Sequence, residues 1–107
     1  METSTSTLDG LVASTLYAVS QQNRYNHFGE RQVSPVASLG SIGMQTTKQH
    51  GPALEISVKY DYTGYYSADA FADSLARVIP QGVPYKVIVV DGSGSVTSES
   101  VPHHRIA

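Results

Sequence analysis

The chain contains no cysteine and no tryptophan, and it has only two phenylalanines among its 107 residues. Without cysteine there is no disulfide framework, no thiolate nucleophile and no cysteine-based zinc site. Charged residues make up only 15% of the sequence, and the formal net charge is -2. The seven lysines and arginines are scattered, so the basic stripe that phosphate contacts require is missing and nucleic acid is not expected as a partner.

Long apolar runs are missing as well. No stretch approaches the roughly 20 residues that span a bilayer, so no membrane partner is expected. The first residues, Met-Glu-Thr-Ser-Thr-Ser-Thr, lack the basic and apolar regions of a signal peptide. These features predict a protein that resides in the cytoplasm, or in a virion if it is of phage origin.

Catalytic and cofactor motifs are also missing. No Gly-x-Ser-x-Gly elbow is present, and no motif places a histidine beside a nucleophile. His103 and His104 are adjacent and would point to opposite sides of an extended tail, which does not suit a shared metal. We therefore expect no catalytic residue, no metal site and no cofactor. The enzymatic alternative would use His27 or His50 together with Asp61.

A glycine-rich segment, Asp91-Gly-Ser-Gly-Ser95, has the composition of a phosphate loop or a calcium loop. A phosphate loop needs a helix directly behind its glycines, and here a strand pattern follows. A calcium loop needs more carboxylates and a closing glutamate. We interpret the segment as a hairpin turn.

The clearest secondary-structure pattern lies in the second half of the chain. Residues 54–62 alternate between apolar and polar, as expected of a half-buried strand. Ser67 is placed to cap a helix over residues 68–79, where apolar side chains recur at helical spacing. Residues 85–90 form the next strand pattern, and residues 87–90 are apolar on both faces, which predicts the most central strand.

The remaining segments are assigned around this unit. Residues 1–6 are polar and expected to be mobile, and a helix is expected over residues 8–22 from its apolar spacing. Residues 24–52 are interrupted by proline and glycine, and we interpret them as an irregular arm or loop that carries one short strand. The alternative is a plain hairpin with an unassigned turn. A weak edge strand is expected over residues 96–101.

These elements predict a single α+β domain over residues 1–107. Its sheet would have three to four strands, mostly antiparallel, packed on the two helices at about 8–22 and 68–79.

Four tyrosines fall within seven residues at the end of the alternating strand: Tyr60, Tyr62, Tyr65 and Tyr66. Tyrosine offers a large, rigid contact area with a polar tip, which is typical of interfaces. The alternative is that Tyr60 and Tyr62 pack under the helix while Tyr65 and Tyr66 shield the turn after the strand.

The order of elements resembles the small tail-terminator (tail-completion) proteins of tailed bacteriophages. The residues that carry this likeness are Leu54-Glu-Ile-Ser-Val-Lys-Tyr60, the helix over 68–79, and Tyr85-Lys-Val-Ile-Val-Val-Asp91. The resemblance implies a ring-forming structural protein that packs against tail-tube subunits through its sheet edge and a loop. It carries over no functional residue. The sequence departs from the family in residues 24–52, which lack clear paired strands, and in the added hairpin at Asp91.

We therefore expect a non-enzymatic structural or assembly protein, and a phage tail or neck is the specific form of this expectation. It would act by forming a homo-oligomer or by docking to another structural protein. Val96 and Val101 on the edge strand, together with the arm at 24–52, would offer unpaired backbone groups to a neighbour. The alternative is a small ligand-binding or regulatory module with a crevice between helix and sheet.

Overall fold

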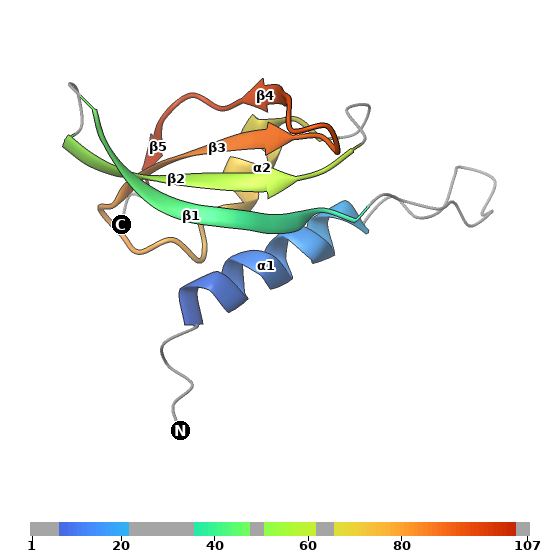
Figure 1. Ribbon diagram of the computed structural model, residues 1–107. Helices are drawn as coiled ribbons and strands as arrows, with labels where there is room; N and C mark the ends of the chain where they lie inside the picture. The colour runs from blue at the N-terminus through green and yellow to red at the C-terminus, as the bar shows by residue number, and fades with distance from the viewer. Residues whose placement is uncertain (1–6, 22–35, 48–50, 62–65, 105–107) are drawn as a thin grey trace.

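The computed structural model describes residues 7–21, 36–47, 51–61 and 66–104. The elements follow in the order α1 (Thr7–Ser20), β1 (Ser38–Thr47), β2 (Gly51–Lys59), α2 (Ala68–Leu75), β3 (Pro84–Val90), β4 (Val96–Glu99) and β5 (His103–His104) (Figure 1). The strand order is β1-β2-β3-β4, and the short β5 pairs with β3. Only the β2–β3 pair is parallel in this sheet, and α2 forms the crossover between its strands. The predicted α+β architecture with a mostly antiparallel sheet is confirmed.

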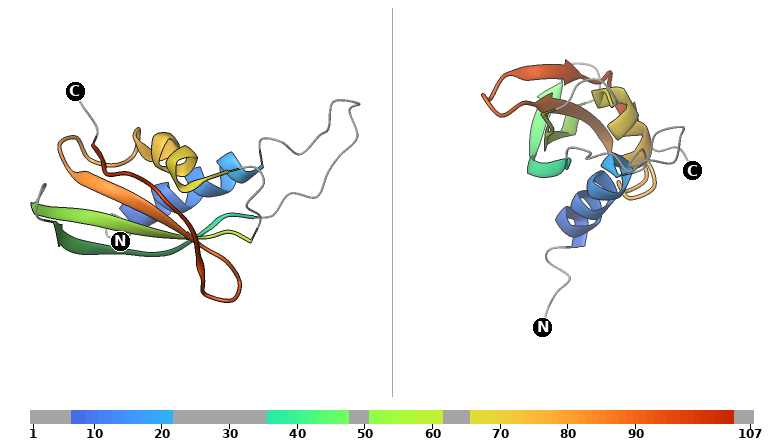
Figure 2. Two further views of the ribbon diagram at one scale, coloured as in Figure 1. Left: turned by 90° about the horizontal axis from the view of Figure 1, so that it is seen from above. Right: turned by 90° about the vertical axis from the view of Figure 1, so that its right-hand side faces the viewer.

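Both helices cover one face of the sheet, and the core lies between the two layers (Figure 2). On β2, Ile56 and Val58 are fully buried and Leu54 is partly buried, so the predicted apolar face of this strand is confirmed. On β3 the inward side chains are Tyr85, Val87 and Val89. The helices contribute Val12, Leu16, Val19, Ala68, Phe71, Ala72 and Leu75. Every second residue of the strands and residues at the 3.6-residue repeat of the helices therefore face the same apolar core.

Residues 38–47 correct the expectation of an irregular arm. They form β1, a ten-residue strand that pairs antiparallel with β2, in agreement with the alternative of a hairpin. Residues 24–35 and 48–50 of the expected arm lie outside the described residues. The register shifts between Leu39 and Ser41, so a bulge at Gly40 lets Leu39 and Ile42 occupy the same face despite their odd spacing. A Cβ atom at Gly40 would lie 3.1 Å from the carbonyl oxygen of Ser57, which explains why a glycine occupies the bulge.

The ends of the helices differ slightly from the predicted bounds. The side chain of Ser67 accepts a hydrogen bond from the Ala70 amide at 3.3 Å, which confirms it as the N-cap of α2. The helix ends at Leu75 instead of residue 79, because the amides of Ala76 and Val78 bond to carbonyls three residues back. Helix α1 ends at Ser20, close to the predicted end. The expected mobile segment 1–6 lies outside the described residues.

Candidate functional site

Tyr60 belongs to the core, which corrects its assignment as an interface residue. Its side chain is 2% exposed, and its ring meets Phe71 edge-on with centroids 5.3 Å apart. The Tyr60 amide bonds to the Val90 carbonyl, so the ladder continues past the end of β2 and keeps this side chain on the helix-covered face. Tyr66 is partly buried against the same core, with its ring 5.6 Å from that of Phe71. Tyr62 and Tyr65 lie outside the described residues.

The two valines predicted at the edge strand are exposed, but that strand is shorter than expected. Val96 is 55% exposed and Val101 is 62% exposed, while β4 has only four residues and ends at Glu99. It ends there because Ser100 turns inward and is only 5% exposed. Its hydroxyl accepts a hydrogen bond from the Val87 amide at 2.9 Å and donates one to the Val101 carbonyl at 2.8 Å.

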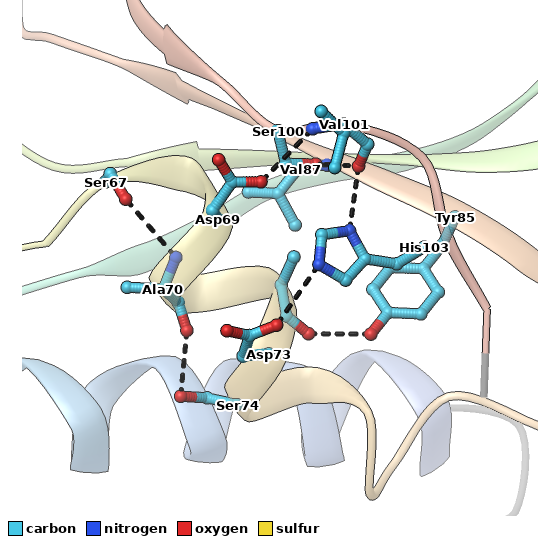
Figure 3. Close-up of polar contacts among 11 residues, drawn as sticks. Ser67, Asp69, Ala70, Asp73, Ser74, Tyr85, Val87, Ser100, Val101 and His103 are labelled. Carbon is cyan, nitrogen blue, oxygen red and sulfur yellow. Dashed lines mark hydrogen bonds and ion pairs between the residues drawn. The ribbon is translucent and has the colours of Figure 1, made fainter. Parts of the chain in front are cut away.

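Side chains of α2 hold down the segment that follows β4 (Figure 3). The Val101 amide donates to the Asp69 carboxylate at 3.2 Å, and Nε2 of His103 lies 3.2 Å from the Asp73 carboxylate. Nδ1 of His103 lies 2.8 Å from the Val101 carbonyl. The segment after β4 is therefore held by contacts within the chain, and β4 itself ends the sheet as a strand of only four residues.

Tyr85 supports the same region from beneath. Its hydroxyl donates to the Ala72 carbonyl at 2.6 Å, and the Ala76 amide bonds to Asp73 instead of to Ala72. Burial, and secondly the negative charge of Asp73, raise the pKa of Tyr85, so the phenol remains protonated and donates this bond. These contacts give the phenol the geometry of a structural donor.

The segment from Asp91 to Ser95 is the hairpin turn that was predicted. The Asp91 carboxylate accepts from the Ser93 amide at 2.9 Å, from the Ser93 hydroxyl at 2.7 Å and from the Ser95 amide at 3.0 Å. The Ser93 hydroxyl contributes most to lowering the pKa of Asp91. Gly94 has a φ of 88°, which few other residues adopt. The carboxylate is thus used to order the turn.

Histidine and carboxylate side chains do not gather into a metal site in the described part of the chain. No group of three or more His, Asp or Glu residues lies there in an arrangement that would hold a metal ion. His27 and His50, the histidines of the enzymatic alternative, lie outside that part.

The outer edge of β1 is the feature that the sequence did not reveal. Within the described residues, no strand pairs with this edge. Its sequence, Ser-Leu-Gly-Ser-Ile-Gly-Met-Gln-Thr-Thr, holds no charged residue and no proline. Charge and proline are two of the devices that protect edge strands from pairing with other chains. Met44 is 63% exposed and Val36, just before the strand, is 54% exposed.

A row of charges crosses the other strands on the face away from the helices and stops at β1. Lys86 on β3 forms a salt bridge with Glu99 on β4, and its ammonium lies 4.0 Å from the Glu55 carboxylate on β2. The residue of β1 opposite Glu55 is Gly43. Strands β2, β3 and β4 thus each contribute one charged side chain to this row, and β1 contributes none.

A groove of about 600 Å³ lies between the two helices. Ser14, Thr15 and Ala18 line one wall, and Asp73, Ser74 and Arg77 line the other. In the described residues the space between the helices and the sheet is filled by the core, and this groove lies between α1 and α2.

No family model matches the chain, and no curated protein or solved structure matches it. The likeness to tail-terminator proteins therefore stays a prediction. Neither helix in the described ranges is long and apolar enough to cross a membrane.

Proposed function

We propose that this protein is a non-enzymatic assembly component that acts through protein–protein contacts along the β1 edge of its sheet. A neighbouring strand would add to Ser38–Thr47 by backbone hydrogen bonds, and side chains on alternating positions would set the specificity. The proposal keeps the mode of action expected from the sequence, which is self-association or docking to another structural protein. It moves the main contact from Val96 and Val101 to β1.

The observation that carries the proposal is the length and chemistry of β1. A ten-residue edge without charge or proline presents a regular row of backbone donors and acceptors. Such an edge is a liability for a monomer, because it also favours unspecific aggregation. Such an edge is no liability if a partner covers it when the protein functions.

A phage tail or neck is the specific assembly that we propose, and its location would then be the virion. This finer proposal rests only on the likeness in element order carried by residues 54–60, 68–79 and 85–91. Electron microscopy of the purified protein tests it, because a ring-forming component should give closed rings. Filaments or irregular clusters would leave the general proposal in place and remove the specific one.

Sedimentation velocity of the full chain over a wide concentration range tests the general proposal. We expect a species larger than the monomer whose fraction rises with concentration. A second measurement uses a synthetic peptide with the sequence of residues 38–47, which should bind and slow hydrogen exchange in the β1 amides. A monomer at every concentration that also ignores the peptide would overturn the proposal.

Ligand binding is the second candidate function, and the groove between the helices favours it. Its walls combine hydroxyl groups with one acidic and one basic side chain, Asp73 and Arg77, so a small polar molecule would suit it. A thermal-shift screen of polar metabolites tests this candidate, since a ligand that binds only the folded state raises the melting temperature. The matched variant Ser14→Leu should abolish any shift that arises in the groove.

A further inference from the structure

We infer that the partner of the β1 edge is a second copy of this chain, paired antiparallel through a two-fold axis that passes close to Met44. The two sheets would then form one continuous sheet of eight principal strands, twice the four of a single chain. This inference rests on the proposed function and names the partner for the same edge.

The difference between the two sheet edges favours a closed dimer over a head-to-tail contact through this sheet, so a ring would have to join such dimers through a second surface. A head-to-tail contact would need β1 of one copy to pair with β4 of the next. β4 has only four residues, and the segment after it is bonded to Asp69 and Asp73 of its own chain. A two-fold contact needs only the β1 edge, because the same surface then serves both partners.

The absence of charge on β1 matters more for a self-contact than for any other. In such a strand pair the residue on the two-fold axis faces its own copy, so a lysine or glutamate there would meet a like charge, which destabilises the pair. No residue from Ser38 to Thr47 is charged. The negative charge of Glu55 on the neighbouring strand lies within reach of Lys86, so it is partly compensated before a partner approaches.

The position of the axis follows from the regular part of the strand. The bulge at Gly40 breaks the register, and the pairing with β2 then runs without interruption from Ser41 to Thr47. The longest regular contact between two copies of this stretch is centred on its middle residue, Met44. Met44 is 63% exposed and points to the helix-covered face, so the two Met44 side chains would cover each other across the axis.

The flank of α1 extends this contact. α1 packs on β1 while α2 packs on β3 and β4, so the side of α1 that faces away from α2 lies toward the β1 edge. Ser14, Thr15 and Ala18 face α2 across the groove, and Tyr17 is turned away from them by the helical repeat. Tyr17 is 52% exposed, and a copy joined through β1 would bring a second α1 toward it.

The first test compares two lysine substitutions of similarly exposed apolar residues, one on each edge. Met44→Lys places two ammonium groups opposite each other at the proposed axis, and it should weaken the dimer by about tenfold or more. Val96→Lys, at 55% exposure on β4, is the matched control and should leave the dimer unchanged. Thermal unfolding of both variants checks that the fold is intact, as expected for exposed positions.

The second test uses the absence of cysteine from the chain, so that each variant carries a single thiol. Met44→Cys should form a disulfide-linked dimer under mild oxidation, because residues directly opposite across a strand pair have their Cβ atoms near disulfide distance. Val96→Cys should form it far more slowly. Equal rates for the two variants would overturn the inference.

The outcomes separate the inference from the proposed function. A dimer weakened by Met44→Lys alone, with a cross-link at residue 44, supports both. An assembly that Met44→Lys does not affect overturns the self-contact through β1 and leaves an assembly role through another surface. A monomer that nevertheless binds the 38–47 peptide overturns the homodimer and supports docking to a different partner. A monomer that ignores the peptide overturns both.

Discussion

The two edges of this sheet differ in how far they are protected against pairing with other chains. On the β4 side, the strand is short, the chain turns inward at Ser100, and two aspartates of α2 bond to the segment that follows. On the β1 side, a ten-residue strand ends the sheet without a charge, a proline or a neighbouring strand in the described residues. Edge strands are normally protected. The proposed contact through β1 rests on this contrast between a long uncovered strand and a short strand whose following segment is held by α2.

The same contrast separates two kinds of exposed residue. Val101 is exposed beside a backbone amide that is already bonded to Asp69, so its exposure alone says little about binding. Met44 is exposed on a strand whose outer edge has no neighbouring strand among the described residues. Exposure is therefore informative here only together with the state of the backbone next to it.

The largest expected effect concerns the core that supports both edges. Phe71 is fully buried and contacts Tyr60 and Tyr66, so Phe71→Ala should destabilise the fold by about 3–5 kcal/mol. Urea unfolding followed by circular dichroism measures this change. A single transition is expected, because both helices and the strands β1, β2 and β3 contribute side chains to one core. Two separate transitions would show that the edges fold independently.

A smaller effect is expected where the β4 side is closed. Ser100→Ala removes the acceptor of the buried Val87 amide, which should cost about 1–3 kcal/mol of stability. Ser41→Ala, an exposed serine on β1, is the matched control and should change stability by no more than about 0.5 kcal/mol. Denaturant unfolding of the two variants measures the difference. Equal effects would contradict the stabilising role of the buried Ser100 hydroxyl.

Tyr85 gives a test at high pH. Because its pKa is raised in the folded state, its stabilising effect is present below the unfolded value of about 10 and is lost as the pH rises through the folded value. Tyr85→Phe should remove this alkaline loss of stability and, through the missing bond to Ala72, cost about 0.5–1.5 kcal/mol at neutral pH. Melting curves at pH 7 to 11 measure both. An unchanged alkaline profile would contradict this role.

The smallest effect is expected at the turn that leads into β4. The pKa of Asp91 is lowered in the folded state, so its carboxylate stabilises the fold above the unfolded value of about 3.9 and loses this effect as the pH falls through the folded value. Asp91→Asn keeps an acceptor oxygen but no longer titrates, so the variant should show a shallower loss of stability in acid. Melting temperatures between pH 3 and pH 6 measure the slope. The control is Asp61→Asn, which replaces an exposed aspartate whose side chain lies beside Gly92.

Most of the elements were predictable because their patterns are local. Ser67 as a cap, the alternation from Leu54 to Val58 and the apolar run in β3 each need only neighbouring residues to be recognised. The full length of β1 was missed because the bulge at Gly40 changes the spacing of its apolar residues from two to three. A bulge is stabilised by the partner strand, so the sequence of β1 alone does not display the pattern.

The candidate site was less predictable than the fold. The tyrosine composition pointed to an interface, yet Tyr60 is taken up by the core because it follows β2 on the helix-covered face. Ser100, Asp69, Asp73 and His103 were not grouped by any spacing, since they come from two elements that meet only in the folded chain. Recognising β1 as an edge strand would have required the burial of its side chains, which only the structure gives.

Short-range preferences of the chain were enough to specify two amphipathic helices, the central strands and the turn at Asp91, because each depends on the order of polar and apolar residues over a few positions. Which strand ends the sheet, which tyrosine lies in the core and which edge has no neighbouring strand among the described residues were decided only by tertiary structure. These properties depend on pairing between distant segments, and the backbone groups on an edge strand are satisfied or exposed according to the neighbour that the fold places beside them.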